Sequence, residues 1–134
     1  MLYCIPNLFD EIELKIIDKV ISDDQWDIAK VGYPQIHPEA RSTKITWINN
    51  EILNKKLGQS FEIANEYYKF IITELFEVGI LKYDVGDYYK KHIDIGGPVD
   101  IKTKFPSRKL SLITQLSSNY EGGDTFLYTN DIPT

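Results

Sequence analysis

The chain has few of the residues that build metal clusters and covalent cross-links. Cys4 is the only cysteine among 134 residues, so an internal disulfide bond and a cluster held by several thiolates are both excluded. The chain has only two histidines, His37 and His92, and only two arginines, Arg41 and Arg108. Any site that needs an imidazole or a guanidinium group must therefore use one of these four residues.

The sequence also lacks the features of membrane, secreted and nucleic-acid-binding proteins. No apolar run approaches the roughly 20 residues needed to span a bilayer. The segment Met1–Pro6 has neither the basic start nor the apolar stretch of a secretion signal. The formal charge is −5, and lysine and arginine form no cluster that matches a row of phosphates. We therefore expect a cytoplasmic protein that binds neither membranes nor nucleic acid.

Length and composition predict one globular domain. Apolar residues make up 43% of the chain and charged residues 26%, as in ordinary soluble proteins. Nine tyrosines are an unusual share for this length. Each brings a large apolar ring with a hydroxyl at its tip, which suits the margin of a core and equally a pocket for a polar ligand.

Two segments of the first half show the apolar spacing of helices. The first covers about residues 8–22 with Asn7 as the expected N-cap, and the second covers about residues 50–72 after Asn49 or Asn50. Between them, Lys44–Ile48 is rich in β-branched and aromatic residues and predicts a short strand, with Trp47 expected in the core.

The second half has the pattern of strands separated by turns. We expect strands near residues 76–85, 89–94, 109–117 and 124–129. Helices followed by antiparallel strands predict an α+β fold, in which N-terminal helices pack on a partial double-stranded β-helix, or jelly roll. Residues 1–74 would form a helical support region, and residues 75–134 the first half of the jelly-roll core.

The most informative residues are His92-Ile93-Asp94, at the end of a predicted strand. Residues i and i+2 of a strand point to the same face, so His92 and Asp94 can converge on one metal ion. Nitrogen and oxygen donors without sulfur suit iron(II). A surface histidine beside an aspartate is the simpler interpretation of this short pattern taken alone.

The surrounding sequence adds a family resemblance over about residues 78–129. A tyrosine strand leads into His92-Ile93-Asp94, and an Arg-x-Leu-Ser strand and a Tyr-x-Gly-Gly turn follow. In this order the three segments resemble the prolyl 4-hydroxylase-like branch of the iron(II)- and 2-oxoglutarate-dependent dioxygenases. These segments are Leu81–Asp94, Arg108–Ser117 and Tyr120–Phe126.

The resemblance implies a function and a set of roles. His92 and Asp94 would be iron ligands, and Tyr83 would contact the cosubstrate. The cofactors implied are Fe(II) and 2-oxoglutarate, with ascorbate as a further candidate. The enzyme would hydroxylate a protein, with prolyl residues as the nearest suggestion, or a small molecule. Strand alternation alone adds Gln115 and Thr125 as residues facing the same cavity, and no residue is assigned as catalytic.

Several of these residues have simpler interpretations. Packing in the barrel explains Tyr83 and Tyr89 as well as a ligand contact does. Gly122 and Gly123 fit a turn between strands that needs positive φ.

Two parts of the family pattern are missing from these residues. The pattern continues with a second histidine and with an arginine or lysine for the far carboxylate of 2-oxoglutarate. His37 precedes the strands in a proline-bounded loop, and neither Arg41 nor Arg108 has the family's position. We therefore expect the 134-residue chain alone to be inactive, as a fragment of a longer enzyme or as a natural short form.

The alternative function is a catalytically inactive jelly-roll module for binding or assembly. Half a jelly roll would leave sheet edges and an apolar face uncovered, which folded proteins avoid. Such a chain would self-associate or bind another protein through the uncovered sheet.

Overall fold

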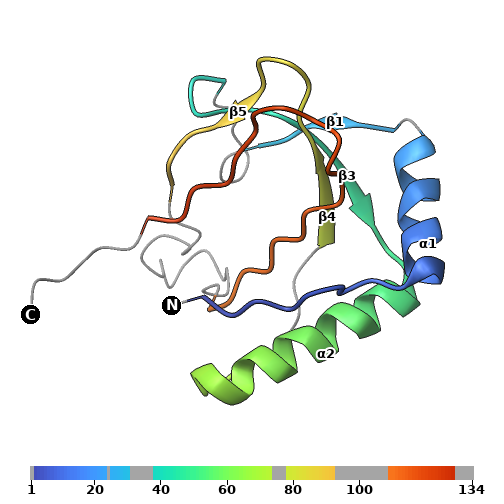
Figure 1. Ribbon diagram of the computed structural model, residues 1–134, viewed down its shortest axis with the longest axis vertical. Helices are drawn as coiled ribbons and strands as arrows, with labels where there is room; N and C mark the ends of the chain where they lie inside the picture. The colour runs from blue at the N-terminus through green and yellow to red at the C-terminus, as the bar shows by residue number, and fades with distance from the viewer. Residues whose placement is uncertain (1, 24, 31–37, 74–77, 93–108, 129–134) are drawn as a thin grey trace, which may run out of the picture.

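The structure is a computed structural model that describes residues 2–23, 25–30, 38–73, 78–92 and 109–128. These residues form a three-stranded antiparallel sheet of order β1-β3-β4, a two-stranded ladder β2-β5 and two helices (Figure 1). The predicted α+β class is therefore confirmed, whereas the jelly roll stays a prediction. The elements are α1 (Glu11–Ser22), β1 (Asp27–Ile28), β2 (Arg41–Ser42), β3 (Lys44–Ile48), α2 (Glu51–Tyr68), β4 (Val78–Lys82) and β5 (Tyr88–Tyr89).

Helix α1 begins later than its apolar spacing predicted, because Asp10 and not Asn7 is its N-cap. The Asp10 carboxylate accepts hydrogen bonds from the backbone N–H groups of Ile12 and Glu13, each at 2.9 Å. The Glu13 carboxylate accepts one at 2.8 Å from the N–H of Asp10, which completes a capping box. Asn7 has φ of 50° and lies in a turn before the helix.

Helix α2 has the predicted N-cap and an earlier end than predicted. Asn50 caps the first turn by accepting two backbone hydrogen bonds. The helix ends at Tyr68 because Lys69 adopts a left-handed conformation with φ of 59°. The Asn65 side chain then bonds both the N–H and the carbonyl oxygen of Phe70 at 2.8 Å. No helix within the described ranges is long and apolar enough to cross a membrane.

The predicted strand Lys44–Ile48 is confirmed as β3, which pairs with β4 along its whole length. The register runs from Lys44 opposite Lys82 to Ile48 opposite Val78. Alternation places Ile48 and Ile80 on one face of this ladder, and Ile48 packs against the core cluster that contains Ile80.

The expected burial of Trp47 is wrong, because its side chain is 53% exposed. Trp47 is one residue from Ile48, so it points to the opposite face of the sheet from the core. It lies opposite Gly79, where an added Cβ would be 3.3 Å from the Trp47 ring and 2.8 Å from Cδ1 of Ile45. The indole therefore lies over a flat part of β4 that has no side chain.

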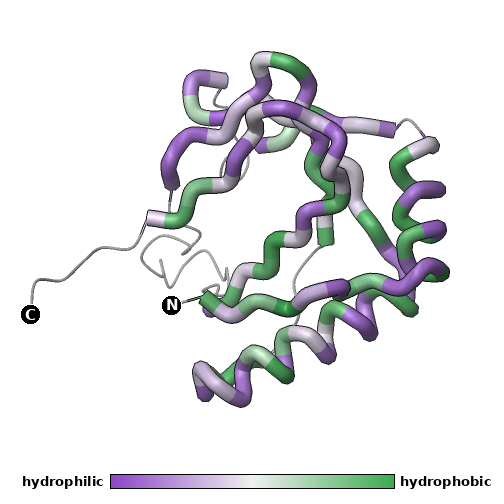
Figure 2. Tube along the Cα trace, viewed as in Figure 1, coloured by the Kyte–Doolittle hydropathy of each residue, from purple (hydrophilic) through white to green (hydrophobic). Residues whose placement is uncertain are grey.

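The central cluster of the core takes one buried side chain from each of α1, α2 and β4. Figure 1 shows both helices beside the three-stranded sheet, with β5 at the far end from α2. Polar and apolar residues alternate around both helices in Figure 2, so each helix has an apolar side that can pack on the sheet. The buried residues of this cluster are Ile17, Leu53 and Ile80, with Phe9, Ile16, Val20, Trp26 and Ile48 packed around them. Leu8, Ala29 and Leu57 are also buried.

The predicted strands of the second half are confirmed only in part. Strand β4 lies within the first predicted range, and β5 is a two-residue piece at the start of the second. Residues 109–117 and 124–128 are described, and they form no strand. Leu110, Leu112 and Thr114 are nonetheless half-buried while their neighbours are exposed, so the alternation that suggested a strand is real. A strand also needs a paired backbone, which side-chain pattern alone does not reveal.

Truncating the central core side chain tests the packing of α2. Leu53 is 1% exposed, so Leu53→Ala should lower the free energy of unfolding by about 3 kcal/mol. Ile52→Ala is the matched control, because Ile52 is 53% exposed and should change stability by less than about 0.5 kcal/mol. Urea unfolding followed by tryptophan fluorescence measures both. Equal losses in the two variants would contradict the described core.

Candidate functional site

The β2–β5 ladder brings Arg41 directly opposite Tyr89. One pair further along, Ser42 is opposite Tyr88, and the N–H of Lys90 donates to the carbonyl of Ala40 at 2.9 Å. The two short strands therefore hold residues 40–42 beside residues 88–90. Directly opposed residues in an antiparallel pair have their side chains on the same face, so Arg41 and Tyr89 can touch.

Tyr89 lies between a cation and an imidazole. The Arg41 guanidinium carbon is 4.3 Å from the centroid of the Tyr89 ring. The His92 ring centroid is 3.6 Å from the same point, with the two ring planes 18° apart. Both groups lie over the centre of the Tyr89 ring, where one face has room for only one of them. The guanidinium and the imidazole therefore cover opposite faces of the ring. We call Arg41, Tyr89 and His92 the three-layer stack.

The three-layer stack is fixed at its Arg41 end by hydrogen bonds. Arg41 Nε donates to Oγ1 of Thr43 at 2.6 Å, and one terminal nitrogen donates to the carbonyl of Lys30 at 3.4 Å. Thr43 is only 3% exposed, and its own carbonyl accepts from the N–H of Ala29 at 2.9 Å. The guanidinium is thus anchored on a buried residue between β2 and β3.

The third layer, His92, carries a hydrogen bond that suits a metal ligand. Nδ1 of His92 lies 2.7 Å from the carbonyl oxygen of Lys90. A carbonyl can only accept, so this bond requires a proton on Nδ1 and, in the neutral ring, leaves the lone pair on Nε2. Metal-bound histidines commonly have this arrangement, with the second nitrogen donating to a carbonyl or carboxylate. His92 is exposed and therefore accessible.

The turn between β4 and β5 sets the spacing of the tyrosines on either side. The N–H of Asp87 donates to the carbonyl of Asp84 at 2.9 Å, and Gly86 has φ of 88°, as the third position of a type II turn requires. The Asp87 carboxylate accepts from Ser42 Oγ at 2.6 Å and from the N–H of Asp84 at 2.9 Å. These two hydrogen bonds, with Ser42 the stronger contributor, lower the pKa of Asp87.

Asp84 neutralises two lysines that face each other across the sheet. Lys44 and Lys82 are directly opposite in the β3–β4 register, a position where like charges repel. The Asp84 carboxylate lies 2.8 Å from Nζ of Lys44 and 3.8 Å from Nζ of Lys82. The hydrogen bond from Lys44 is the main cause of the lowered pKa of Asp84.

Tyr83, the predicted cosubstrate contact, lies between β4 and this turn. Its side chain is 48% exposed. Partial burial raises the pKa of the Tyr83 phenol, and the positive charge of Arg41 opposes that rise. Arg41 therefore acts electrostatically on Tyr83 and also contacts the Tyr89 ring, against which His92 stacks.

The structure tests only part of the predicted metal site. Asp94, His37 and Arg108 lie outside the described residues. Within the described part of the chain, no three His, Cys, Asp or Glu residues form a group that could hold a metal ion. His92 by itself fits one ligand position, through its donor type, its exposure and the bond at Nδ1.

Gln115 and Thr125 are exposed residues of segments that form neither helix nor strand. The Gln115 amide lies 3.4 Å from the carbonyl of Ser117, and Thr125 is three residues before Tyr128. The Tyr128 ring is 4.2 Å from Nζ of Lys91, so this end of the chain lies beside the residue that precedes His92. The predicted role of Gln115 and Thr125 in the cavity stays a prediction.

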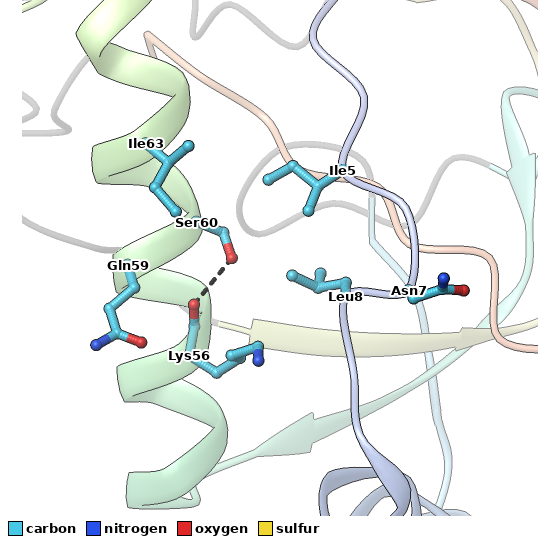
Figure 3. A pocket seen from close by; sticks show the side chains of 7 residues that line it. All are labelled: Ile5, Asn7, Leu8, Lys56, Gln59, Ser60 and Ile63. Carbon is cyan, nitrogen blue, oxygen red and sulfur yellow. Dashed lines mark hydrogen bonds between the residues drawn. The ribbon is translucent and has the colours of Figure 1, made fainter.

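Two surface hollows lie elsewhere in the fold. Neither includes a predicted site residue. The hollow between α2 and the N-terminal segment measures about 220 Å³, smaller than most ligand pockets (Figure 3). Three apolar residues, Ile5, Leu8 and Ile63, and four polar residues, Asn7, Lys56, Gln59 and Ser60, line it. The Ser60 hydroxyl donates to the carbonyl of Lys56 at 2.9 Å. The second hollow, of about 460 Å³, is lined by Gln25, Trp26, Asp27, Thr46 and Trp47.

Sequence reasoning missed Arg41 as a member of the site. The family pattern places its carboxylate-binding arginine elsewhere in the sequence, so the resemblance gives Arg41 no role. A partial signal was available, because Arg41 precedes a predicted strand and tyrosines precede His92. Only the strand register shows that these residues face each other.

No family model, curated protein or solved structure matches the chain. The resemblance to the 2-oxoglutarate dioxygenases therefore rests on the quoted motifs alone.

The Asp87 turn gives a prediction about pH. Because its pKa is lowered in the fold, the Asp87 carboxylate contributes stability above its usual pKa, and this contribution is lost as the pH falls. Asp87→Asn should therefore flatten the loss of stability between about pH 5 and about pH 3. Urea midpoints across that range measure the effect. The control Asp18→Asn, at an exposed position of α1, should keep the wild-type slope. An unchanged slope in Asp87→Asn would count against the described turn.

Proposed function

We propose that this chain supplies the first part of the active site of an iron(II)- and 2-oxoglutarate-dependent dioxygenase. His92 and Asp94 would hold the iron, and Tyr83 would contact 2-oxoglutarate. The substrate would be a protein, with a prolyl residue as the first candidate, or a small molecule. Ascorbate is a further candidate cofactor.

The single observation that carries the proposal is the state of the His92 ring. Its Nδ1 is hydrogen-bonded to the Lys90 carbonyl and one of its faces is covered by Tyr89. Both contacts limit rotation of the imidazole, and the hydrogen bond to the Lys90 carbonyl favours the tautomer with its lone pair on Nε2. An ordinary surface histidine needs neither constraint. The His-x-Asp pattern and the order of the family motifs add support from the sequence.

The proposed reaction hydroxylates the substrate and at the same time converts 2-oxoglutarate to succinate and CO2. When bound, iron and 2-oxoglutarate activate O2, so that one oxygen atom enters succinate, the other hydroxylates a C–H bond, and CO2 leaves. This chain's residues would bind and orient these groups. His92 and Asp94 would bind the metal on one face and leave other positions open. Tyr83, whose pKa is raised, keeps its phenol proton at neutral pH and can donate a hydrogen bond.

The second candidate function is a binding or assembly module without catalysis. It is favoured by the face of the sheet opposite the core, where Trp47 and Leu81 are 53% and 41% exposed. Self-association through this face would cover both side chains. This alternative requires no metal, so it predicts that the state of His92 is irrelevant to function.

We expect the 134-residue chain to bind Fe(II) weakly and to release no succinate above background. Two protein ligands give a weak site, and the resemblance provides no matched arginine for the far carboxylate. Anaerobic equilibrium dialysis with Fe(II) and a succinate assay measure the two quantities. His92→Ala should lower iron binding to background, whereas Lys91→Ala, at the adjacent exposed residue, should not.

Two results would change the assignment. Iron binding that is equal in His92→Ala and in the wild type would contradict the proposed ligand. Succinate release that requires iron and is lost in Asp94→Ala would show that His37 or a partner subunit supplies a third ligand. That result would contradict the expectation that this chain is inactive.

A further inference from the structure

We propose that Arg41 is a positioning residue for metal binding, acting on His92 through the Tyr89 ring. This inference rests on the proposed function, because it needs His92 to be a metal ligand. It goes beyond the family resemblance, which assigns no role to Arg41. The observation that carries it is the three-layer stack, in which Arg41 and His92 lie at 4.3 Å and 3.6 Å from the centroid of one ring.

The first step is that Tyr89 is held from both strands. Its backbone is in β5, opposite Arg41 in β2, and its ring is covered by the Arg41 guanidinium. A cation over the face of a tyrosine ring is attracted by the negative charge of that face. The guanidinium is itself fixed to the buried Thr43, so the ring has a rigid support on that side.

The second step is that the supported ring restrains His92. The imidazole is exposed to solvent and sits beyond the end of β5, where strand pairing no longer fixes the backbone. Two described contacts oppose its rotation, namely the nearly parallel Tyr89 ring and the Lys90 carbonyl at Nδ1. If Arg41 is removed, Tyr89 loses its support, and the restraint that its ring places on the imidazole is weakened.

The expected consequence is a change of tautomer. In water, the neutral histidine ring prefers the proton on Nε2, the nitrogen that the proposed site uses for the metal. The stack and the Lys90 carbonyl favour the opposite tautomer. Arg41 therefore contributes to metal affinity without touching the metal, and the effect can be read before any metal is added.

Nitrogen-15 NMR of the histidine side chains tests this directly. The chain has only two histidines, so a His37→Gln background leaves the signals of His92 alone. In this background, among the neutral forms of His92, the Nδ1-protonated tautomer should be the more populated one. Arg41→Gln should shift the signals toward the Nε2-protonated form. Lys90→Gln is the matched control, because it removes a cation 5.8 Å from the neighbouring Tyr88 ring and leaves the stack intact.

Co(II) then measures the effect on binding, since N/O sites hold it more tightly than Fe(II). Paramagnetic broadening of the His92 signals during a Co(II) titration gives an apparent affinity. Arg41→Gln should weaken this affinity about tenfold, as loss of an outer-shell partner commonly does. Tyr89→Phe keeps the ring and should retain wild-type tautomer and affinity, whereas Tyr89→Leu should resemble Arg41→Gln. Circular dichroism confirms that each variant is folded.

The outcomes separate this inference from the proposed function. Unchanged tautomer and Co(II) affinity in Arg41→Gln would overturn the inference while leaving His92 as a ligand. Failure of Co(II) to broaden His92 even in the wild-type chain would overturn the proposed function, and with it the positioning role, whatever the tautomer. A tautomer shift with about tenfold weaker binding in Arg41→Gln, absent in Lys90→Gln, supports both.

Discussion

The antiparallel pairing of β3 with β4 is the constraint on which the rest of the structure depends. Its five residue pairs join the first half of the chain to the second. The register decides which side chains meet the helices, so Ile80 joins Ile17 and Leu53 in the core. The same pairing places residues 41–43, just before β3, near residues 83–90, just after β4. The short β2–β5 ladder and its three-layer stack are extensions of this arrangement.

A shift of the register by one residue would exchange the two faces of the sheet. Trp47 would then face the core, and Ile48 would face away from it. Interactions near both ends of the β3–β4 ladder favour the described register. Asp84 offsets the repulsion between Lys44 and Lys82, and Gly79 leaves space for the Trp47 indole. The position of Arg41 opposite Tyr89 depends on the same register, so packing of the core and geometry of the site are coupled.

The sequence predicted the parts of the fold that local chemistry determines. Apolar spacing found both helices, and the β-branched run at Lys44–Ile48 found β3. The start of α1 was misplaced because Asn7 and Asp10 are both good caps, and only Asp10 has Glu13 three residues later to complete the capping box. The burial of Trp47 and the position of Arg41 depend on strand register, a long-range property that no local pattern contains. His92 was predicted to be a ligand from its spacing to Asp94, and that role stays a prediction, whereas its contact with Tyr89 required the structure.

The central claim is that His92 and Asp94 bind one iron ion. Anomalous diffraction from crystals grown anaerobically with Fe(II) tests it most directly, because iron is located without any assumption about its ligands. The account predicts one anomalous peak within coordination distance of His92 Nε2 and of the Asp94 carboxylate, with Nδ1 of His92 still bonded to the Lys90 carbonyl. Iron bound elsewhere, or Asp94 directed away from His92, would contradict the account.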